Sequence, residues 1–257
     1  PVSGLGDVYK RQLLHTPFDK EDAYHSLSMP VYNTAAYEFD TAEAMEEAFC
    51  GRTADHAYSR ITNPTVQYFE KRIQTITGAL SVTALNSGMA AISNIFFTLA
   101  QAGANIVTSA HLFGNTYSFF KSTLAAFGVE VRFCDLTNPE AVRAQVDENT
   151  CAVFLEVITN PQLEVADLKV LSGIAHQIGA PLIADTTVVP FHIFHANEFG
   201  VDIEIVSSTK YISGGATSLG GLILDYGTFD WRNSKKLRSM ADQFGASTFT
   251  AKLRKEI

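Results

Sequence analysis

The stretch Val206-Ser207-Ser208-Thr209-Lys210-Tyr211-Ile212-Ser213-Gly214-Gly215 contains a lysine between the end of a predicted strand and a glycine-rich loop. Residues 201–206, which lead into it, alternate apolar and acidic side chains, a pattern typical of a strand that enters a site. The neighbours of Lys210 offer hydroxyl groups rather than carboxylates, so it does not look like an ordinary solvated charge. The pattern suits a lysine that forms a Schiff base, although by itself it leaves a surface or structural role equally open.

Outward from this stretch, short apolar strands alternate with segments of helical periodicity. The predicted strands cover residues 80–85, 105–109, 129–133, 152–157, 181–185, 201–206 and 221–225. Residues 86–91 lead into a predicted helix that runs to about residue 102. Further helices are predicted over 117–127, 139–146 and 168–177. Because strands separated by helices of crossover length form parallel sheets, the sequence predicts an α/β fold with a mostly parallel sheet and helices on both faces.

Composition narrows the class of function. The 257 residues are 46% hydrophobic, enough for a large core, and the formal net charge is -8. An acidic chain without a long basic run favours neither nucleic acid nor an anionic membrane as its main partner. No apolar stretch has the length of a bilayer span and no basic-then-apolar leader is recognisable, so we expect a cytoplasmic protein that acts on small molecules.

Both ends of the chain differ from the alternating pattern. Residues 1–12 lack a starting methionine and any periodicity, and we expect a disordered leader or sequence foreign to the natural protein. Residues 13–65 are polar and irregular, apart from a helix over 41–49 that Thr41 can cap, and are predicted to form an N-terminal arm. Residues 66–257 form the predicted large domain, which begins with helical spacing and ends in an amphipathic helix over 251–257 without a stop signal.

In an open α/β sheet the ligand lies beyond the carboxyl ends of the strands, so the residues after each strand are considered together. Those that follow or end the predicted strands here are Ser87, Gly88, Met89, Asn160, Asp185, Ser207 and Thr209. A helix that begins at 87–89 offers free N–H groups to a phosphate, and Asp185 is a buried carboxylate at a strand end. Singly, these residues can be turn residues and helix caps. Together with Lys210, they provide what pyridoxal phosphate needs.

Metal and disulfide chemistry have weak support. His192 and His195 lie three residues apart, but no third ligand is evident, so we expect structural histidines and no metal. Cys50, Cys134 and Cys151 are far apart and lack CxxC spacing, so we expect reduced, mostly buried thiols.

Several motifs in this order resemble one enzyme family. They are Tyr58-Ser59-Arg60-x-x-Asn63-Pro64-Thr65, Asn86-Ser87-Gly88-Met89-Ala90, Glu156-x-x-x-Asn160-Pro161, Asp185-Thr186-Thr187 and Ser207-x-Thr209-Lys210-Tyr211. Together they are similar to the Cys/Met-metabolism family of pyridoxal-phosphate (PLP) enzymes, and the match runs from about Tyr32 to the end of the chain. The resemblance implies a PLP-dependent transferase of fold type I whose C-terminal domain is absent from this chain.

The resemblance also implies a role for each matching residue. Lys210 would carry the cofactor and shuttle protons, Asp185 would pair with the pyridine nitrogen, and Asn160 would contact the ring hydroxyl. The residues implied for the cofactor phosphate are Ser87, Gly88, Met89, Ser207 and Thr209. Tyr58 and Arg60 would reach the phosphate of a neighbouring subunit, which implies a homodimer or homotetramer with shared sites; the planar guanidinium of arginine suits that contact.

Residues 112–117 and 209–217 most resemble the branch of this family that holds the O-acetylhomoserine sulfhydrylases. The implied reaction is γ-replacement of O-acetyl-L-homoserine by sulfide or a small thiol, giving homocysteine or methionine and acetate. Phe113 stands where the family often has a tyrosine stacked on the cofactor, which weakens a lyase hypothesis that needs a phenolic acid. The alternatives are cystathionine γ-synthase, cystathionine lyase, methionine γ-lyase and a catalytically inactive fragment, since the arginine for the substrate carboxylate lies outside this chain.

Overall fold

The computed structural model describes residues 16–18, 24–191, 193–215 and 217–256. The predicted leader, residues 1–12, lies outside these ranges. The chain divides into two compact units, Pro1–Ile76 and Thr77–Ile257. Within the described residues, no helix is long and apolar enough to cross a membrane.

The described part of the first unit contains the helix α2 (Ala42–Phe49) and all but the last residue of α3 (Pro64–Thr77). The hydroxyl of Thr41 accepts the N–H of Ala44 at 3.1 Å, so the predicted cap of α2 is confirmed. α3 begins at Pro64, earlier than the predicted start at residue 66, because proline needs no hydrogen-bond partner in the first turn of a helix.

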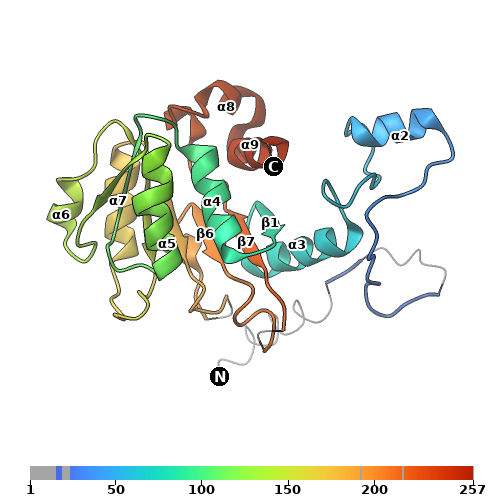
Figure 1. The fold of residues 1–257 in the computed structure, drawn as a ribbon, viewed down its shortest axis with the longest axis horizontal. Coiled ribbons are helices and arrows are strands. Elements are labelled where there is room, and N and C mark those ends of the chain that lie inside the picture. Colours follow the sequence, from blue (N-terminus) through green and yellow to red (C-terminus); the bar gives the residue numbers. More distant parts are fainter. Residues whose placement is uncertain (1–15, 19–23, 192, 216, 257) are drawn as a thin grey trace. The chain divides into compact units, whose positions relative to one another are not determined.

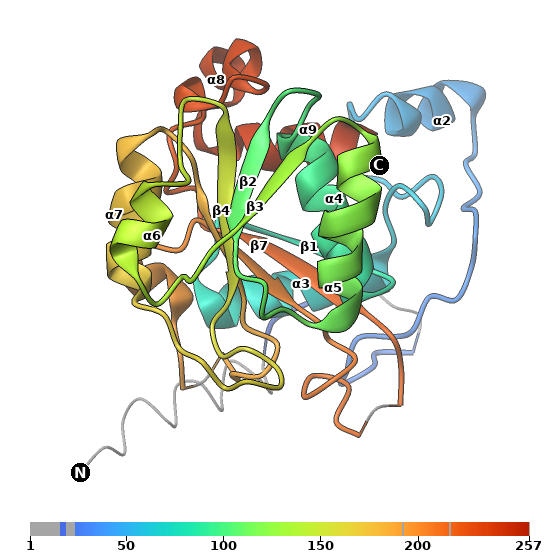
Figure 2. The same ribbon diagram turned by 60° about the vertical axis from the view of Figure 1, so that its left-hand side comes forward.

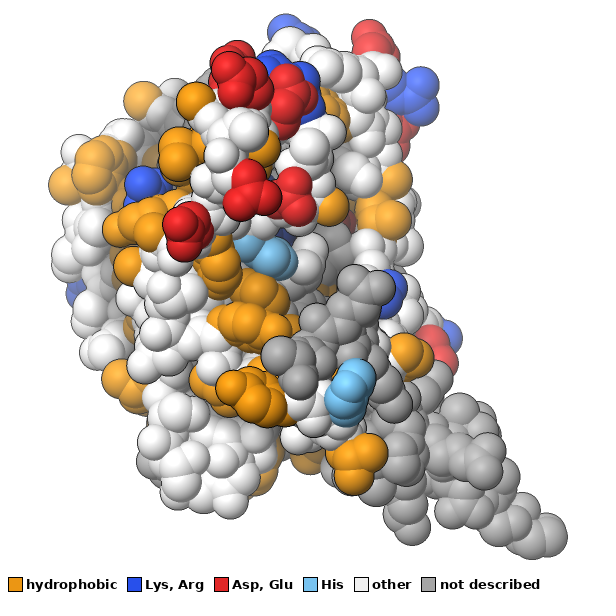
Figure 3. Space-filling view, turned by 90° about the vertical axis from the view of Figure 1, so that its right-hand side faces the viewer, with side chains coloured by type: hydrophobic (Ala, Val, Ile, Leu, Met, Phe, Trp, Pro, Cys, Tyr) orange, Lys and Arg blue, Asp and Glu red, His pale blue; other side chains and the backbone are white. Residues whose placement is uncertain are grey.

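Large hydrophobic side chains are exposed along the first unit. Those with more than half of their surface exposed are Tyr24, Leu27, Val31, Phe49 and Ile61. The space-filling view shows hydrophobic surface, in orange, beside clusters of acidic side chains, in red (Figure 3). Exposed apolar surface of this kind is typical of regions that contact another protein.

The second unit is built on a seven-stranded sheet with the strand order β1-β7-β6-β5-β4-β2-β3. The strands are β1 (Ser81–Leu85), β2 (Asn105–Thr108), β3 (Glu130–Phe133), β4 (Thr150–Glu156), β5 (Leu182–Asp185), β6 (Ile203–Val206) and β7 (Gly221–Asp225). Strands β2 to β6 pair in parallel among themselves, while β7 pairs antiparallel with both β1 and β6. The predicted mostly parallel sheet is therefore confirmed.

Helices cover both faces of this sheet, as the sequence predicts (Figure 1, Figure 2). On one face lie α4 (Gly88–Leu99), α5 (Gly114–Ser118) and its continuation η1 (Phe119–Leu124), and on the other lie α6 (Pro139–Arg143) and α7 (Leu168–Gln177). The last helices, α8 (Arg238–Phe244) and α9 (Thr248–Glu256), pack into the apolar core on the α4 face. Short 3-10 turns complete the unit at η2 (Ala196–Phe199), η3 (Trp231–Asn233) and η4 (Gly245–Ser247).

Each face of the sheet has its own apolar core. Ile183 of β5 packs into the core beneath α4, whereas Leu182 and Ala184 pack into the core beneath α7. All three side chains are fully buried, as expected for a central parallel strand covered on both faces. Packing on both faces therefore holds β5 in the middle of the sheet.

Two local predictions are corrected. The helix predicted over 117–127 begins at Gly114, directly after the loop that follows β2, and continues as a π-helix over Phe119–Leu124. Cys50 is exposed rather than buried because it closes the exposed C-terminal end of α2, and all three cysteines are free thiols. Cys134 and Cys151 are partly buried, and burial raises the pKa of the Cys134 thiol to about 11 and that of Cys151 to about 12.

Candidate active site

The carboxyl ends of β1, β4, β5 and β6 lie along one edge of the sheet. Glu156 at the end of β4 pairs in register with Asp185 at the end of β5, and Asp185 pairs with Ile205 of β6. Gly221, the first residue of the antiparallel β7, pairs with Leu85 at the end of β1. The segments after these strands therefore meet at the edge where open α/β sheets bind ligands.

The segment after β1 turns into the N-terminus of α4. Ser87 is the N-cap residue, and its Oγ accepts the N–H of Ala90 at 3.1 Å. The first-turn N–H groups, which include those of Gly88 and Met89, have no partner within the helix and lie at the positive end of its dipole. The Met89 side chain packs against the core and its sulfur accepts the Thr116 hydroxyl at 3.7 Å, so Met89 offers its N–H to this edge. The helix start suits an anion such as a phosphate.

Two glycines allow other backbone segments to approach this helix start closely. A Cβ atom on Gly88 would lie 2.8 Å from the Cβ of Ser207, in the loop after β6. A Cβ atom on Gly221 would lie 2.0 Å from the carbonyl oxygen of Ser87. The start of α4 is therefore a direct neighbour of Ser207 and of the start of β7, and a larger residue at Gly88 or Gly221 would disturb one of these two contacts.

Asp185 ends β5 and is partly buried. Burial raises the pKa of Asp185, while hydrogen bonds from Thr187 lower it. The Thr187 N–H donates to Asp185 Oδ1 at 2.9 Å, and Thr187 Oγ1 accepts the N–H of Ser207 at 2.8 Å. A carboxylate in such surroundings is stabilised by a cation, so Asp185 can hold a protonated nitrogen of a ligand.

Lys210 follows β6 in a turn that is fastened to the start of β7. The Thr209 N–H donates to the carbonyl of Gly220 at 3.3 Å, and the Gly220 N–H donates to Thr209 Oγ1 at 3.1 Å. The Lys210 N–H donates to the carbonyl of Ser207 at 3.2 Å. This hydrogen bond places Lys210 in the same tight turn as Ser207, the neighbour of the α4 N-terminus. The Lys210 residue is exposed.

Phe113 and Asn160 lie on the loops that follow β2 and β4, and both are exposed. The Glu156 carboxylate binds the N–H of Phe113 at 2.5 Å and the N–H of Asn160 at 3.2 Å. Burial and, to a lesser extent, the charge of Asp185 raise the pKa of Glu156 to about 7, and the two N–H groups limit the rise. Besides Asp185, the site thus contains a carboxyl group, Glu156, whose pKa is raised to about 7.

Glu156 and Thr187 connect the predicted site residues, and sequence analysis assigned no role to either of them. A signal for Glu156 was present, since it is an acidic residue at the end of an apolar strand and opens the motif that contains Asn160. Thr187 is a hydroxyl residue two positions after Asp185, a spacing at which the aspartate can bind the later N–H in an Asx turn. Its contact with Ser207 has no local signal, because the two residues lie on different strand ends.

Tyr58 and Arg60 belong to the first unit. The Arg60 guanidinium carbon lies 5.4 Å from the centre of the Tyr58 ring, a cation–π arrangement. The side chain of Asn63 donates to the carbonyl of Tyr32 at 3.0 Å and to the hydroxyl of Tyr37 at 3.1 Å, which holds the loop. Tyr58 and Arg60 therefore lie on one loop that is held by the hydrogen bonds of Asn63. Their role toward a neighbouring subunit stays a prediction.

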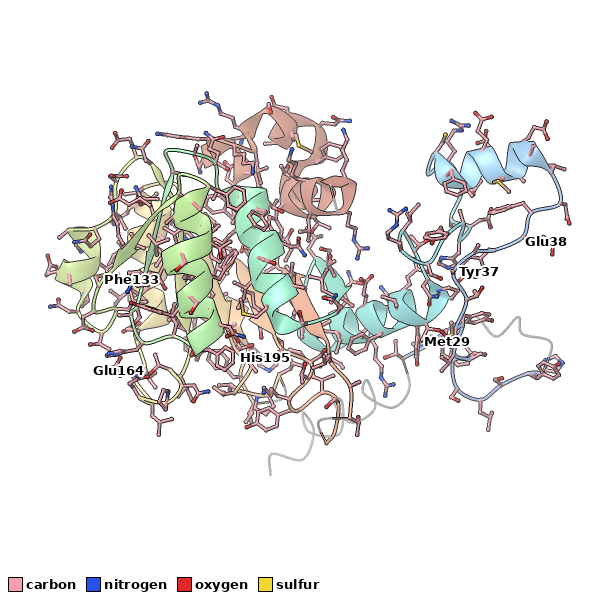
Figure 4. All side chains as sticks on the ribbon, viewed as in Figure 1. Met29, Tyr37, Glu38, Phe133, Glu164 and His195 are labelled. Carbon is pink, nitrogen blue, oxygen red and sulfur yellow. The ribbon has the colours of Figure 1, made fainter. Side chains whose placement is uncertain are left out.

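The histidine pair lies only partly within the described residues. His195, labelled in Figure 4, directly precedes η2, whereas His192 falls outside the described ranges. In the part of the chain that the structure describes, no three His, Cys, Asp or Glu side chains form a group that could hold a metal ion.

Comparison with known families agrees with this geometry. A family model described as Cys/Met metabolism PLP-dependent enzyme matches residues 10–252. An O-acetyl-L-homoserine sulfhydrylase of Corynebacterium glutamicum is 38% identical over 81% of this chain, and a homocysteine synthase of Schizosaccharomyces pombe is 37% identical over 87%. These alignments cover 48% and 52% of the relatives, so the chain spans about half the length of the curated relatives it matches.

Solved structures agree as well. O-acetylhomoserine sulfhydrylase of Wolinella succinogenes is 48% identical with a TM-score of 0.71, over 77% of this chain and 57% of that one. A putative O-acetylhomoserine (thiol)-lyase of Campylobacter jejuni is 31% identical with a TM-score of 0.80, over 84% of this chain and 51% of that one. The Campylobacter structure contains a pyridoxyl-lysine monophosphate.

Proposed function

This chain belongs to the Cys/Met metabolism family of PLP-dependent enzymes, and on that premise we propose that the whole protein is a transferase that replaces the acetate of O-acetyl-L-homoserine with sulfide or a small thiol. The products are homocysteine or methionine, and acetate. The observation that carries the proposal is the convergence of Lys210, Asp185 and the α4 N-terminus at one edge of the sheet. The relatives named as sulfhydrylases and homocysteine synthases support the choice of substrate.

The residues at this edge fit pyridoxal phosphate. The α4 N-terminus beside Ser207 forms a cradle for the phosphate, and the absence of a Cβ at Gly88 makes that approach feasible. Asp185 is partly buried and burial raises its pKa, so a protonated pyridine nitrogen is a suitable partner for its carboxylate. Phe113 presents an exposed aromatic ring that can stack, and Asn160 an exposed amide that can contact a ring hydroxyl.

When bound, the cofactor provides an electron sink for charge at the α-carbon of an amino acid. Asp185 keeps the positive charge on the ring nitrogen that makes the sink effective. Lys210 would hold the cofactor through its amine, and the same amine, when free, would move protons at the substrate Cα and Cβ. Ser87, Gly88, Met89, Ser207 and Thr209 hold the phosphate so that Lys210 meets the substrate at a fixed distance.

The side chain at position 113 supports replacement over elimination. Phenylalanine can stack on a ring but has no hydroxyl with which to donate a proton to a leaving group. A lyase of this family that needs a phenolic acid at this position would lack it here. Cystathionine γ-synthase chemistry uses the same machinery with a larger thiol and is the nearest alternative.

We also propose that the protein assembles as a homodimer or homotetramer with Tyr58 and Arg60 serving the site of a neighbouring subunit. The exposed apolar side chains of the first unit, such as Leu27 and Val31, support an arm that is covered by another chain. Arginine suits the phosphate contact because its planar guanidinium group can bind two oxygens at once.

The proposed location is the cytoplasm. Cys50 is an exposed free thiol, and exposed thiols persist in compartments that glutathione and thioredoxin keep reducing. A reaction that consumes sulfide and small thiols needs the same conditions.

The activity is tested on the full-length protein with its Lys210→Ala variant. Wild-type protein should form homocysteine and acetate from O-acetyl-L-homoserine and sulfide, and turn over cystathionine or methionine slowly. Lys210→Ala should lose roughly 10²–10⁴-fold in rate, as expected for a missing proton-transfer group. Lys235→Ala is the matched control, because Lys235 is also exposed but is bonded to Asn149, near the start of β4. Fast cleavage of methionine without a thiol acceptor would show a lyase instead.

Cofactor attachment is tested on this 257-residue chain as well. A visible absorbance band that disappears on borohydride reduction, with the added mass on the Lys210 peptide, supports the assignment of Lys210. No band in this chain but a band in the full-length protein favours the alternative that these residues alone are a catalytically inactive fragment. No band in either protein contradicts the proposed function.

A further inference from the structure

One buried carboxyl group joins the two loops that carry Phe113 and Asn160. Glu156 is 8% exposed; its Oε1 accepts the N–H of Phe113 at 2.5 Å and its Oε2 accepts the N–H of Asn160 at 3.2 Å. We propose that Glu156 is a positioning residue that holds Phe113 and Asn160 in place for ligand binding. The inference rests on the proposed function, in which these two residues contact the cofactor.

The two hydrogen bonds require two acceptor atoms on one side chain. An ionised carboxylate has two oxygens and no donor, so it can accept both N–H groups at once. A glutamine of the same size has one oxygen and one NH₂ group, which would face an N–H donor on one of the two loops. The geometry is therefore specific for an acid at this position and cannot be explained by side-chain volume.

Glu156 is anchored more firmly than the loops that it joins. It is the last residue of β4, between β2 and β5, and it pairs in register with Asp185. Phe113 and Asn160 are separated by 43 and 4 residues from Glu156, so the contact with Phe113 is a long-range tie. Because the strand end is fixed by packing on both faces of the sheet, it can serve as the reference point for both loops.

A second link joins the same loops at the surface. His111 Nδ1 lies 2.7 Å from Glu164 Oε2, and both side chains are more than a third exposed. Figure 4 labels Glu164, which lies in the loop that follows β4. Exposed ion pairs contribute little because water screens them, so this outer link provides a control for the inner one.

The groups around Glu156 influence the pH at which its carboxyl group ionises. Asp185 faces it from β5, and the His111–Glu164 pair lies farther out on the two loops. Burial and the charge of Asp185 raise the pKa of Glu156 to about 7. As the pH rises through that value, the carboxyl group becomes the better acceptor, and both loop N–H groups should become more protected.

The experiment measures hydrogen exchange of the Phe113 and Asn160 amides in the cofactor-free full-length protein, together with the affinity for added pyridoxal phosphate. Glu156→Gln should accelerate exchange of at least one of these amides roughly tenfold, the change for one lost hydrogen bond to a charged group. It should weaken cofactor affinity by a similar factor and abolish the pH dependence of amide protection. Glu164→Gln, the matched acid-to-amide control, should change neither amide by more than about twofold.

Equal exchange of both amides in Glu156→Gln and wild type overturns the proposal, as does an equal effect of Glu164→Gln. If Glu156→Gln does not fold, the pH dependence of protection in the wild-type protein decides, and protection that stays constant through about pH 7 overturns the proposal. Amide exchange is measured without cofactor, so its outcome is independent of the proposed function. If Glu156→Gln alters amide exchange but the wild-type protein does not bind pyridoxal phosphate, the proposed function is contradicted. The role of Glu156 in holding the two loops is supported in that case.

Discussion

The hydroxyl of Thr187 accepts the N–H of Ser207 at 2.8 Å, and so connects the end of β5 to the loop after β6. The same threonine donates its N–H to Asp185 at 2.9 Å. The candidate ring-nitrogen partner and a candidate phosphate contact are therefore fixed to each other through one residue. A change at Thr187 should affect both.

Thr187→Val removes the acceptor and keeps the shape of the side chain. We expect a loss of about 1–2 kcal/mol in the free energy of unfolding, because the Ser207 N–H loses its partner. Cofactor affinity should fall as well, since Ser207 and Asp185 can shift apart. Thr187→Ser retains the hydroxyl and should behave nearly like wild type. Chemical denaturation and cofactor titration measure the two effects, and equal behaviour of the Val and Ser variants would contradict the role of the hydroxyl.

Gly221→Ala should strongly destabilise the second unit. Its Cβ atom would lie 2.0 Å from the Ser87 carbonyl oxygen and 2.8 Å from the Gly88 nitrogen, both backbone atoms that cannot move aside easily. The expected loss is about 3 kcal/mol, at the upper end of overpacking costs, with weaker cofactor binding. Gly173→Ala is the control, because no heavy atom lies within 4 Å of its Cβ position in α7, and it should stabilise the protein by about 0.5–1 kcal/mol. Similar unfolding midpoints for the two variants would show that the α4 cradle is not tight.

His176 should make stability depend on pH. Its Nε2 lies 2.7 Å from Oδ2 of Asp202, which is 1% exposed, and this hydrogen bond raises the pKa of His176 above its ordinary value of 6.5. The folded state therefore binds the proton more tightly than the unfolded state. The stabilisation is fully present below about pH 6.5 and is lost as the pH rises through the folded-state pKa. Denaturation of wild type and His176→Gln across this range should show a decline that the variant lacks, and parallel profiles would contradict it.

Subunit mixing tests the proposed shared site. Arg60→Ala and Lys210→Ala should each be impaired as pure full-length proteins. In a mixed dimer one site combines an intact Arg60 from one chain with an intact Lys210 from the other, so mixing should restore up to about a quarter of the wild-type activity if each dimer retains one site and half of the dimers are mixed. Subunit exchange is verified by mass spectrometry of differently labelled chains. If activity does not recover although subunit exchange is proven, the shared-site proposal is wrong. Tyr58 and Arg60 would then belong to a loop with a structural role in their own chain.

Elements with local signals could be predicted from the amino-acid sequence. The helix over Leu168–Gln177 and the strand over Gly221–Asp225 form at the predicted residues, because periodicity and the Asp167 cap specify the helix and an apolar run specifies the strand. The meeting of the segments after β1, β5 and β6 was also predictable, since parallel strands end at the same edge. The reach of Tyr58 and Arg60 to a second subunit stays a prediction.

The contacts that hold the site together could not be predicted in this way. The sequence does not show that antiparallel β7 lies between β1 and β6, and therefore that Gly221 meets Ser87. Nor does it show that the Glu156 carboxylate spans to Phe113, 43 residues away. These contacts depend on strand order and on the packing of both sheet faces, which arise from the whole chain at once. Local propensity cannot encode them, because each is a relation between segments that become neighbours only when the sheet has formed.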